Sequence, residues 1–338
     1  MASLLTDSFG RAVTYLRLSV TDRCDMRCLY CMAENMTFLP REDMLGGEEM
    51  QRVAEAFIRS GVRRIRLTGG EPLVRHETLP LIRRLGAWLD RPEGMPGLDE
   101  ITLTTNGSRL RDNAGALYEA GVRRINVSLD SLRPERFREI TRRGNLDQVL
   151  DGIRAAREAG LALRINTVAM AGTNDDETDE LIRYCGKIGA DLCLIETMPM
   201  GETGDDRRNR YLPLTELRRD LETRWTLEPL TWRTGGPARY VRVGETGRRL
   251  GFITPLTHNF CEGCNRVRLS CTGRLYTCLG QEDGGDLRAV LRAGGSDQDL
   301  LAAIGEAIRH KPRGHDFVLD RDTDVISGPQ RHMSVTGG

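Results

Sequence analysis

A short pattern that recurs along the chain constrains its fold more than any other feature. The phrase Gly-Val-Arg-Arg-Ile occurs at 61–65 and again at 121–125, each time after a helical stretch and at the start of an apolar run. Glycine commonly ends a helix in the left-handed conformation, and a β-branched apolar run is typical of a buried strand. The same order returns around Gly160 and Gly189. The pattern therefore predicts strands and helices that alternate.

Alternating strands and helices with right-handed crossovers form a parallel sheet, either doubly wound or closing toward a barrel. The barrel is favoured because polar motifs follow the carboxyl ends of the predicted strands, where the active face of such a barrel lies. We expect strands at 16–21, 65–68, 101–105, 125–129, 163–169 and 192–197, and helices at 48–59, 79–89, 109–119, 146–158 and 177–187.

The pattern changes after about residue 200. Residues 201–210 are polar and contain glycine, which is typical of a linker, and the later segments show short strands without clear crossovers. We therefore expect an α/β fold, a partial TIM barrel of about six βα units with a smaller C-terminal region. The predicted domains are residues 1–214 and 215–338.

The composition excludes several classes of protein. The 338 residues carry 49 Lys and Arg against 49 Asp and Glu, and only 7 Phe, 7 Tyr and 3 Trp. Zero net charge and few aromatic side chains argue against nucleic-acid binding. No apolar run reaches the roughly 18 residues of a membrane helix, and the first residues lack the basic and apolar regions of a secretory signal. We expect a cytoplasmic protein with no membrane partner.

Nine cysteines in a reducing compartment indicate metal binding, catalysis or core packing. Cys24, Cys28 and Cys31 have the spacing C-x3-C-x2-C directly after the first predicted strand. Three thiolates can bind one soft metal centre and leave a coordination position open. Structural zinc prefers four ligands, and packed thiols seldom lie in a loop this polar. The spacing favours an iron–sulfur cluster.

A second triad consists of Cys261, Cys264 and Cys278, with the spacing C-x2-C-x13-C. Cys271 and His258 are candidates for a fourth ligand. A zinc knuckle is a real alternative, because C-x2-C hairpins suit zinc. Taken alone, this triad favours zinc and a cluster about equally; taken with the first triad, it favours a second cluster with an open iron.

The first triad together with Gly-Gly-Glu-Pro at 69–72 resembles the radical S-adenosylmethionine (SAM) superfamily. There the open iron of a [4Fe–4S] cluster chelates the methionine part of SAM, the glycines allow close backbone approach, and the Glu71 carboxylate can meet the ammonium group of SAM. Further motifs narrow the resemblance to the GTP 3′,8-cyclase (MoaA) family of molybdenum cofactor biosynthesis. They are Thr-Asp-Arg-Cys at 21–24, Ile-Asn-Val-Ser-Leu-Asp at 125–130, the segment 260–270 and the final Gly337-Gly338.

The resemblance implies a lyase reaction. A cluster on Cys24, Cys28 and Cys31 would pass one electron to SAM, and the 5′-deoxyadenosyl radical would abstract hydrogen from C3′ of GTP. Attack on C8 of guanine then gives (8S)-3′,8-cyclo-7,8-dihydroguanosine 5′-triphosphate, while the cluster on the second triad binds guanine. The resemblance also implies an external one-electron reductant, a homodimer, and delivery of the product to cyclic pyranopterin monophosphate synthase.

Individual site residues also follow from the resemblance. Those implied to contact SAM are Tyr30, Gly70, Ser128 and Met198. Those implied to contact GTP are Arg17, Arg66, Thr104, Arg164, Arg266, Val267 and Arg268. The implied catalytic residues are Arg266, Arg268, Gly337 and Gly338. Arginine suits the task independently, since guanidinium groups pair with phosphate oxygens bidentately.

The chain departs from the family at two positions: Arg164 stands where lysine is usual, and Cys193 stands where many members have arginine. We interpret Cys185 as a core residue and Cys271 as a bystander. Two alternatives stay open at this point. One is a radical SAM enzyme that modifies a peptide and carries an auxiliary cluster. The other is a zinc-stabilised scaffold without enzymatic activity.

Overall fold

One large twisted sheet organises the chain, in a computed structural model that describes residues 5–205, 207–319 and 326–337. Its strand order is β12-β11-β10-β1-β2-β3-β4-β5-β6-β9-β8-β7. The six central strands run parallel in chain order. They are β1 (Tyr15–Ser19), β2 (Arg64–Thr68), β3 (Glu100–Thr105), β4 (Arg124–Ser128), β5 (Ala162–Ala169) and β6 (Asp191–Glu196). All six predicted strands and the partial barrel are confirmed.

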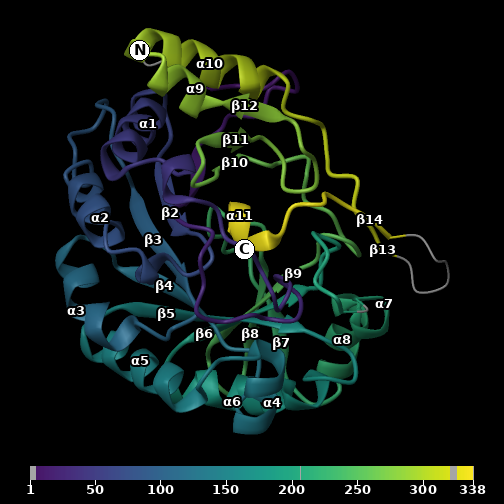
Figure 1. Cartoon of the computed structure of the whole chain (residues 1–338). Helices are drawn as coiled ribbons and strands as arrows, with labels where there is room; N and C mark the ends of the chain where they lie inside the picture. The colour runs from purple at the N-terminus through teal and green to yellow at the C-terminus, as the bar shows by residue number, and fades with distance from the viewer. Residues whose placement is uncertain (1–4, 206, 320–325, 338) are drawn as a thin grey trace.

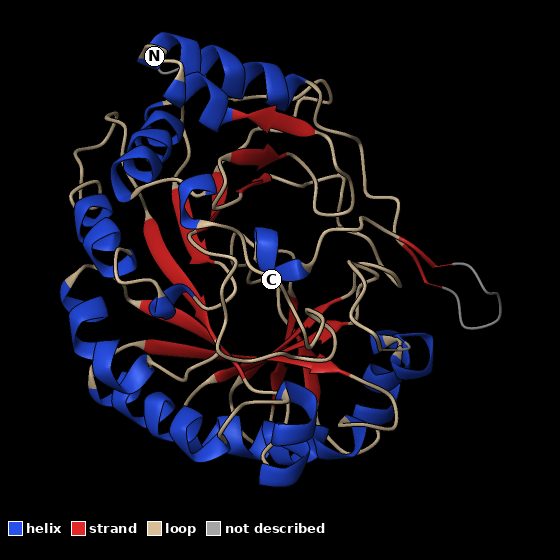
Figure 2. Cartoon of the chain, in the orientation of Figure 1, coloured by secondary structure: helices blue, strands red, loops and turns tan. Residues whose placement is uncertain are grey.

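Helices cover the outer face of this sheet, and the strands curve around the interior (Figure 1, Figure 2). The α-helices are α1 (Gly47–Arg59), α2 (Thr78–Gly86), α3 (Leu110–Glu119), α4 (Pro134–Thr141), α5 (Leu146–Glu158), α6 (Thr178–Ile188), α7 (Arg207–Arg210), α8 (Leu214–Leu221), α9 (Leu287–Arg292), α10 (Asp297–Arg309) and α11 (Met333–Thr336). Short 3-10 turns are η1 (Arg41–Asp43), η2 (Pro72–Val74) and η3 (Asp175–Glu177). The five predicted helices are present, whereas α4 and the helices after residue 200 were not among those predicted.

Side chains alternate between the two faces of each strand, so the sheet has an apolar outer face and a polar inner face. On β1, Leu16 and Leu18 are buried in the main hydrophobic core. Arg17 lies between them and lines an inner cavity. In register beside Arg17 are Arg66 on β2 and Arg268 on β10. Three arginines on neighbouring strands thus occupy one row of the inner face.

Strands from the C-terminal region extend the sheet at both of its edges. They are β7 (Leu227–Pro229), β8 (Arg239–Val243), β9 (Arg249–Ile253), β10 (Arg266–Leu269), β11 (Arg274–Tyr276) and β12 (Gly284–Asp286), while β13 (Val318–Leu319) and β14 (Ile326–Ser327) form a separate hairpin. β9 runs parallel to β6, and β10 runs parallel to β1. The two ends of the parallel sheet are therefore both bordered by the second half of the chain.

The short helix α11 lies inside the ring of strands, near the centre of the view in Figure 1. Met333, Ser334 and Thr336 of this short helix are buried. Among the described residues, no helix combines the length and the apolar character needed to cross a membrane.

Candidate active site

The loop after β1 carries the first cysteine triad at the carboxyl end of the parallel sheet. Cys24, Cys28 and Cys31 are each half-buried, and each is a free thiol. The loop is tied to the end of α4, where the backbone N–H of Leu29 donates to the carbonyl oxygen of Ile140 at 3.0 Å. The three thiols thus lie in a fixed loop at the end of the sheet where a barrel of this type places its active site.

The two glycines after β2 are required by the packing of this loop. The N–H of Gly70 donates to the carbonyl oxygen of Thr21 at 2.8 Å, and that of Glu71 donates to Arg23 O at 2.8 Å. A Cβ on Gly70 would lie 2.3 Å from the carbonyl oxygen of Arg23. Any side chain at Gly70 would therefore push the cysteine loop away from β2.

The Glu71 carboxylate is buried and held by the protein. It accepts hydrogen bonds from Thr105 Oγ1 at 2.8 Å, Asn106 N at 2.7 Å and Leu73 N at 3.0 Å. Burial raises its pKa to about 7 against these hydrogen bonds. Glu71 therefore joins the loops after β2 and β3, and its contact with the ammonium group of SAM stays a prediction.

Tyr30 is fixed by a buried carboxylate beyond the end of β4. Its hydroxyl donates to Asp130 Oδ2 at 2.7 Å, and Val168 N donates to Asp130 Oδ1 at 2.9 Å. Burial raises the pKa of Asp130 to about 6 although both hydrogen bonds favour its charged form. Ser128, the last residue of β4, is half-buried at this same end of the strand. The side chain of Tyr30 is thus anchored at the strand end that carries Ser128.

The setting of the first triad fits an iron–sulfur cluster. Burial raises the pKa of all three thiols, that of Cys31 to about 12, and Glu71 and Asp130 add to the effect at Cys24 and Cys28. Arg207 and Arg27 lower the pKa of Cys31, but burial outweighs them. The positive charge of iron in a cluster would stabilise the thiolate forms against burial and the two carboxylates.

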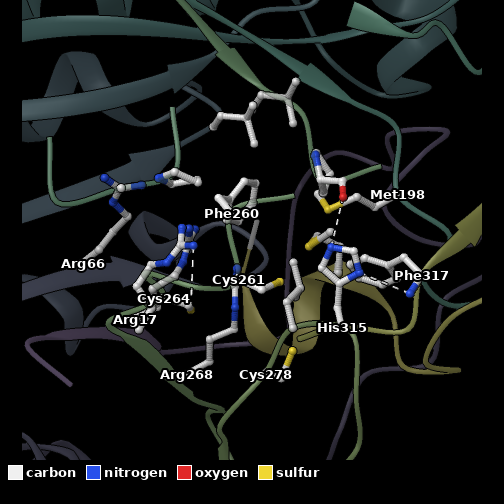
Figure 3. A pocket seen from close by; sticks show the side chains of 18 of the residues that line it. Arg17, Arg66, Met198, Phe260, Cys261, Cys264, Arg268, Cys278, His315 and Phe317 are labelled. Carbon is white, nitrogen blue, oxygen red and sulfur yellow. Dashed lines mark hydrogen bonds between the residues drawn. The ribbon is translucent and has the colours of Figure 1, made fainter. Parts of the chain in front are cut away.

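The second triad lines a cavity inside the ring of strands. Cys261 and Cys264 lie between β9 and β10, Cys278 follows β11, and all three face this cavity (Figure 3). Glu196, the last residue of β6, secures the start of the loop by accepting hydrogen bonds from Leu256 N at 3.0 Å and Thr257 N. A β-strand end from the first half of the chain thus positions the second triad.

The electrostatic setting of the second triad is cationic. Lys311 Nζ lies 3.6 Å from Cys264 Sγ, and Arg266 Nη2 lies 3.9 Å from it. Burial opposes ionisation of Cys264, but Arg266 and Lys311 together outweigh it and lower its pKa to about 7. A thiol of this kind is ready to bind a metal centre near neutral pH.

Five arginines line the same cavity: Arg17, Arg66, Arg164, Arg266 and Arg268. Burial lowers the pKa of Arg17 and Arg66, that of Arg66 to about 10, and neighbouring arginines lower both further. Burial and the neighbouring Arg266 and Arg331 lower the pKa of Arg268 to about 9. Like charges gathered in a buried space favour a polyanionic ligand.

The side chains of Val267 and Thr104, which are also implied to contact GTP, do not line the cavity as the five arginines do. Val267 is fully buried in the main core, on the face of β10 opposite to Arg266 and Arg268. Only its backbone can therefore face the cavity. Thr104 is half-buried on β3 and its Oγ1 accepts from Asn126 Nδ2 at 3.4 Å, but it is not among the residues that line the cavity.

The two positions that depart from the family are neighbours in the structure. Cys193 is fully buried against Tyr240 and Ala238. The Tyr240 hydroxyl accepts a hydrogen bond of 2.8 Å from Arg164 Nη1, and Asn166 Oδ1 accepts from Arg164 Nε at 3.1 Å. Arg164 is therefore held in place by two side chains while it lines the cavity.

The remaining cysteines lie apart from both triads. Cys185 is buried in the main core, which confirms that prediction, and Cys271 is fully buried in the same core. Neither Cys271 nor His258 is among the residues that line the cavity. The structure therefore brings neither of these two candidate fourth ligands into the cavity with the second triad.

The C-terminal tail reaches Arg268. Arg268 Nη1 donates to the carbonyl oxygens of Gly337 and Thr336. Gly337 has φ of +72°, and a Cβ there would lie 2.0 Å from Thr68 Oγ1. Both the backbone conformation and the contact with β2 therefore require glycine at this position. Gly338 lies outside the described residues.

A small apolar group links the two triads. Met200, Phe317 and Met333 form it, and partly buried side chains that pack against it include Cys31 of the first triad, Met198, and Leu279 next to Cys278. Met198 also lines the cavity of the second triad. One apolar group thus lies between Cys31 of the first triad and the residue that follows Cys278 of the second.

Across residues 5–205, 207–319 and 326–337, no three His, Cys, Asp or Glu side chains are placed to hold a single metal ion. A structural zinc site needs its ligands around one point, whereas a four-iron cluster spreads three thiolates over three different irons.

Sequence reasoning missed three residues that support the cavity: Lys311, Tyr240 and Arg331, whose Nη2 donates to the carbonyl oxygens of Cys278 and Leu279. Of these three residues, only Lys311 could have been noticed in the sequence, because the chain contains just two lysines among its 49 basic residues.

The barrel, the loop-borne triad and the glycines after β2 together define a radical SAM enzyme. A profile of the radical SAM superfamily matches residues 18–185, and one described as Molybdenum Cofactor Synthesis C matches residues 190–317. The structure is similar to that of Streptococcus suis SuiB bound to S-adenosylmethionine, with a TM-score of 0.62 over 88% of this chain and 68% of that one. At 16% identity this similarity concerns the fold alone.

Similarity to curated proteins identifies the family more specifically than similarity of fold does. The chain is 61% identical to a GTP 3′,8-cyclase of Rhizobium etli, over 99% of this chain and 94% of the relative. It is 59% identical to a GTP 3′,8-cyclase of Brucella canis, over 99% of this chain and 96% of the relative. The chain therefore belongs to the GTP 3′,8-cyclase family.

Proposed function

We propose that this protein converts GTP into (8S)-3′,8-cyclo-7,8-dihydroguanosine 5′-triphosphate, the first step of molybdenum cofactor biosynthesis. One observation carries the proposal beyond family membership: five arginines and the second cysteine triad line a single cavity. A triphosphate needs several cationic partners, and a purine base can occupy an open metal position. The cavity therefore combines the two features that a nucleoside triphosphate requires.

Cys24, Cys28 and Cys31 would hold a [4Fe–4S] cluster that binds SAM. When bound, the cluster and SAM supply the 5′-deoxyadenosyl radical that removes hydrogen from C3′ of GTP. Tyr30, Gly70, Ser128 and Met198 would surround SAM. The contact of Met198 with the apolar group that packs against Cys31, and its place in the cavity, support this assignment.

Cys261, Cys264 and Cys278 would hold a second [4Fe–4S] cluster that binds the guanine base. Arg17, Arg66, Arg164, Arg266 and Arg268 would neutralise and orient the triphosphate, with Thr104 and the backbone of Val267 as further contacts. Fixed guanidinium groups lower the cost of holding the ribose beside SAM, because they are oriented before the substrate arrives.

The catalytic residues proposed are Arg266, Arg268, Gly337 and Gly338. Arg268 would hold the tail, as its hydrogen bond to the carbonyl oxygen of Gly337 suggests. With α11 buried inside the ring, the tail would exclude water from the reacting ribose. Water exclusion matters here because a radical intermediate must not meet another hydrogen donor.

Further partners belong to the same proposal. An external one-electron reductant would reduce the first cluster, and cyclic pyranopterin monophosphate synthase would take the product. The protein would act in the cytoplasm as a homodimer. Size-exclusion chromatography with light scattering tests the dimer.

The experiment that tests the function uses protein purified without oxygen. Iron and acid-labile sulfide are measured first; the protein is then reduced with SAM present, and 5′-deoxyadenosine is followed with GTP, ATP or a peptide as substrate. We expect GTP alone to stimulate 5′-deoxyadenosine and to yield the cyclised nucleotide. Equal stimulation by a peptide would favour the peptide-modifying alternative, and a protein with zinc but no sulfide would favour the scaffold.

A further inference from the structure

The segment 311–315, which we call the strap, runs across the second triad without contributing a cysteine. It begins directly after α10 and the capping residue His310. Lys311 at its start is buried, with 2% of its surface exposed. His315 at its end lines the cavity, and its Nε2 lies 3.0 Å from the carbonyl oxygen of Pro255. The strap thus spans the triad from one side to the other.

Lys311 contacts three groups that surround the triad. Its Nζ lies 3.6 Å from Cys264 Sγ, 3.0 Å from the carbonyl oxygen of Arg266 and 2.5 Å from that of Thr277. An ammonium group has three donors and no acceptor, so these three acceptors match it fully. Because Thr277 precedes Cys278, one side chain joins the backbone beside both Cys264 and Cys278.

The rest of the strap is fixed to Cys261. Arg11 Nη1 donates to the carbonyl oxygens of Cys261 and Arg313, both at 2.7 Å, and its Nη2 donates to Pro312 O at 2.6 Å. Gly314 lies against the same cysteine, since a Cβ there would be 3.6 Å from Cys261 Sγ. The strap therefore has a firm contact near every cysteine of the triad.

We propose that Lys311 is a positioning residue for the second cluster, which fixes the separation of the Cys264 and Cys278 segments and places a buried positive charge beside the Cys264 thiolate. The inference rests on the proposed two-cluster function and adds to it a device that sets cluster retention and reduction potential. A cation beside a cluster favours the added electron, and hydrogen bonds to ligating sulfur have the same effect. Groups that hold metal ligands also govern how firmly the metal stays bound.

The chain offers a matched control, because its second lysine, Lys187, is exposed on α6. The variants are Lys311→Met, which removes charge and donors, Lys311→Gln, which keeps donors without charge, Lys311→Arg, which keeps the charge, and Lys187→Met. Each holoenzyme is checked for folding by far-UV circular dichroism. Iron and sulfide are then followed under a chelator, and the potentials of both clusters are measured by redox titration monitored by electron paramagnetic resonance.

In Lys311→Met we expect one cluster to lose its iron to the chelator about tenfold faster than in the unsubstituted protein, and the other at the unchanged rate. In Lys311→Gln we expect one potential to move to a more negative value while the other stays, and 5′-deoxyadenosine formation without GTP to continue. Lys311→Arg and Lys187→Met should match the unsubstituted protein in potential.

Two results would count against the proposal in different ways. If the unsubstituted protein holds both clusters and Lys311→Gln leaves both potentials unchanged, the inference about Lys311 is wrong whether or not Lys311→Met folds. If the unsubstituted protein holds the iron of one cluster only, the two-cluster function fails, and this inference fails with it.

Discussion

The two cysteine triads have the same number of ligands but differ in their electrostatic surroundings, most clearly at Cys24 and Cys28 on one side and Cys264 on the other. Arg207 and Arg27 lie near Cys31 of the first triad, and burial raises the pKa of Cys278 in the second. The first lies near Glu71, Asp25 and Asp130, and burial together with these carboxylates raises the pKa of Cys24 and Cys28. The second lies near Arg266 and Lys311, which lower the pKa of Cys264 to about 7. Negative surroundings favour a cluster that gives up its electron, and positive surroundings favour one that binds an anion. The difference suits an electron donor to SAM and an anchor for GTP.

The largest effect we expect separates the triads by function. Cys28→Ser should abolish 5′-deoxyadenosine formation with or without GTP, because a ligand of the proposed SAM-binding cluster is lost. Cys261→Ser should keep that formation and abolish the cyclised nucleotide. Mass spectrometry of both products, with iron analysis, measures the two outcomes. Unimpaired cyclisation by Cys261→Ser would show that the second triad does not bind the substrate.

The pKa difference predicts a contrast in thiol reactivity in iron-free protein. A lower pKa gives more thiolate at a given pH, so alkylation of Cys264 should rise with pH around a midpoint of about 7. Cys31, with a pKa of about 12, should stay largely unreactive there. At pH 7 we expect a rate ratio on the order of 10² to 10³, since greater intrinsic nucleophilicity partly offsets the smaller thiolate fraction of Cys31. Iodoacetamide labelling with peptide mass spectrometry measures it; equal rates would contradict the contrast.

The tail lies between Arg268 on β10 and Thr68 on β2, and Gly337→Ala should displace it. A Cβ would lie 2.0 Å from Thr68 Oγ1. We expect the rate of cyclised-product formation to fall about 100-fold, which is the effect of a small misplacement in an active site. The rate of 5′-deoxyadenosine formation without cyclisation should change less. Gly189→Ala is the matched control, because Gly189 has a similar φ of +73° but no heavy atom within 4 Å of its added Cβ. A similar loss in both variants would assign the effect to backbone strain alone.

The smallest effect we expect comes from removing a hydrogen bond that holds Arg164 in place. Tyr240→Phe removes the hydroxyl that accepts from Arg164 Nη1 at 2.8 Å. Loss of one such hydrogen bond is worth about 1 kcal/mol, so we expect KM for GTP to rise about fivefold with kcat little changed. Tyr118→Phe, on the exposed Tyr118 of α3, is the control. A change in kcat alone would place Tyr240 in another role.

Much of the first half of the chain could be predicted from the sequence, because each βα unit is local. Glycine follows α1, α3, α5 and α6 within two residues, and the strand after it is largely apolar, so Gly61 and Gly121 mark their strands directly. The pairing of β10 with β1 could not be found this way, because Leu16 and Val267 are partners separated by most of the chain. Alternation of Arg266, Val267, Arg268 and Leu269 predicts a strand but not its neighbour.

In the candidate site, too, residues close together in the sequence could be predicted and residues brought together by folding could not. Cysteine spacing alone singles out both triads as candidate ligands, and their ligand role stays a prediction. Lys311 and Tyr240 could not be assigned, because their importance depends on contacts with Cys264 and Arg164 that only the folded chain creates. Val267 shows the converse limit: the motif includes this residue, but the sequence does not show that its side chain lies in the core, on the face of β10 opposite to Arg266 and Arg268.

The pairing of β9 with β6 and of β10 with β1 has a consequence for the solubility of fragments. A chain cut after residue 214 would leave β1 and β6, which are five and six residues long, with unpaired backbone groups on two sheet margins. In the intact protein the outermost strands are β7 and β12, each three residues long, and β7 ends in Pro229. Short strands and proline at a margin discourage pairing with other molecules. The second half of the chain therefore also protects the first half from self-association.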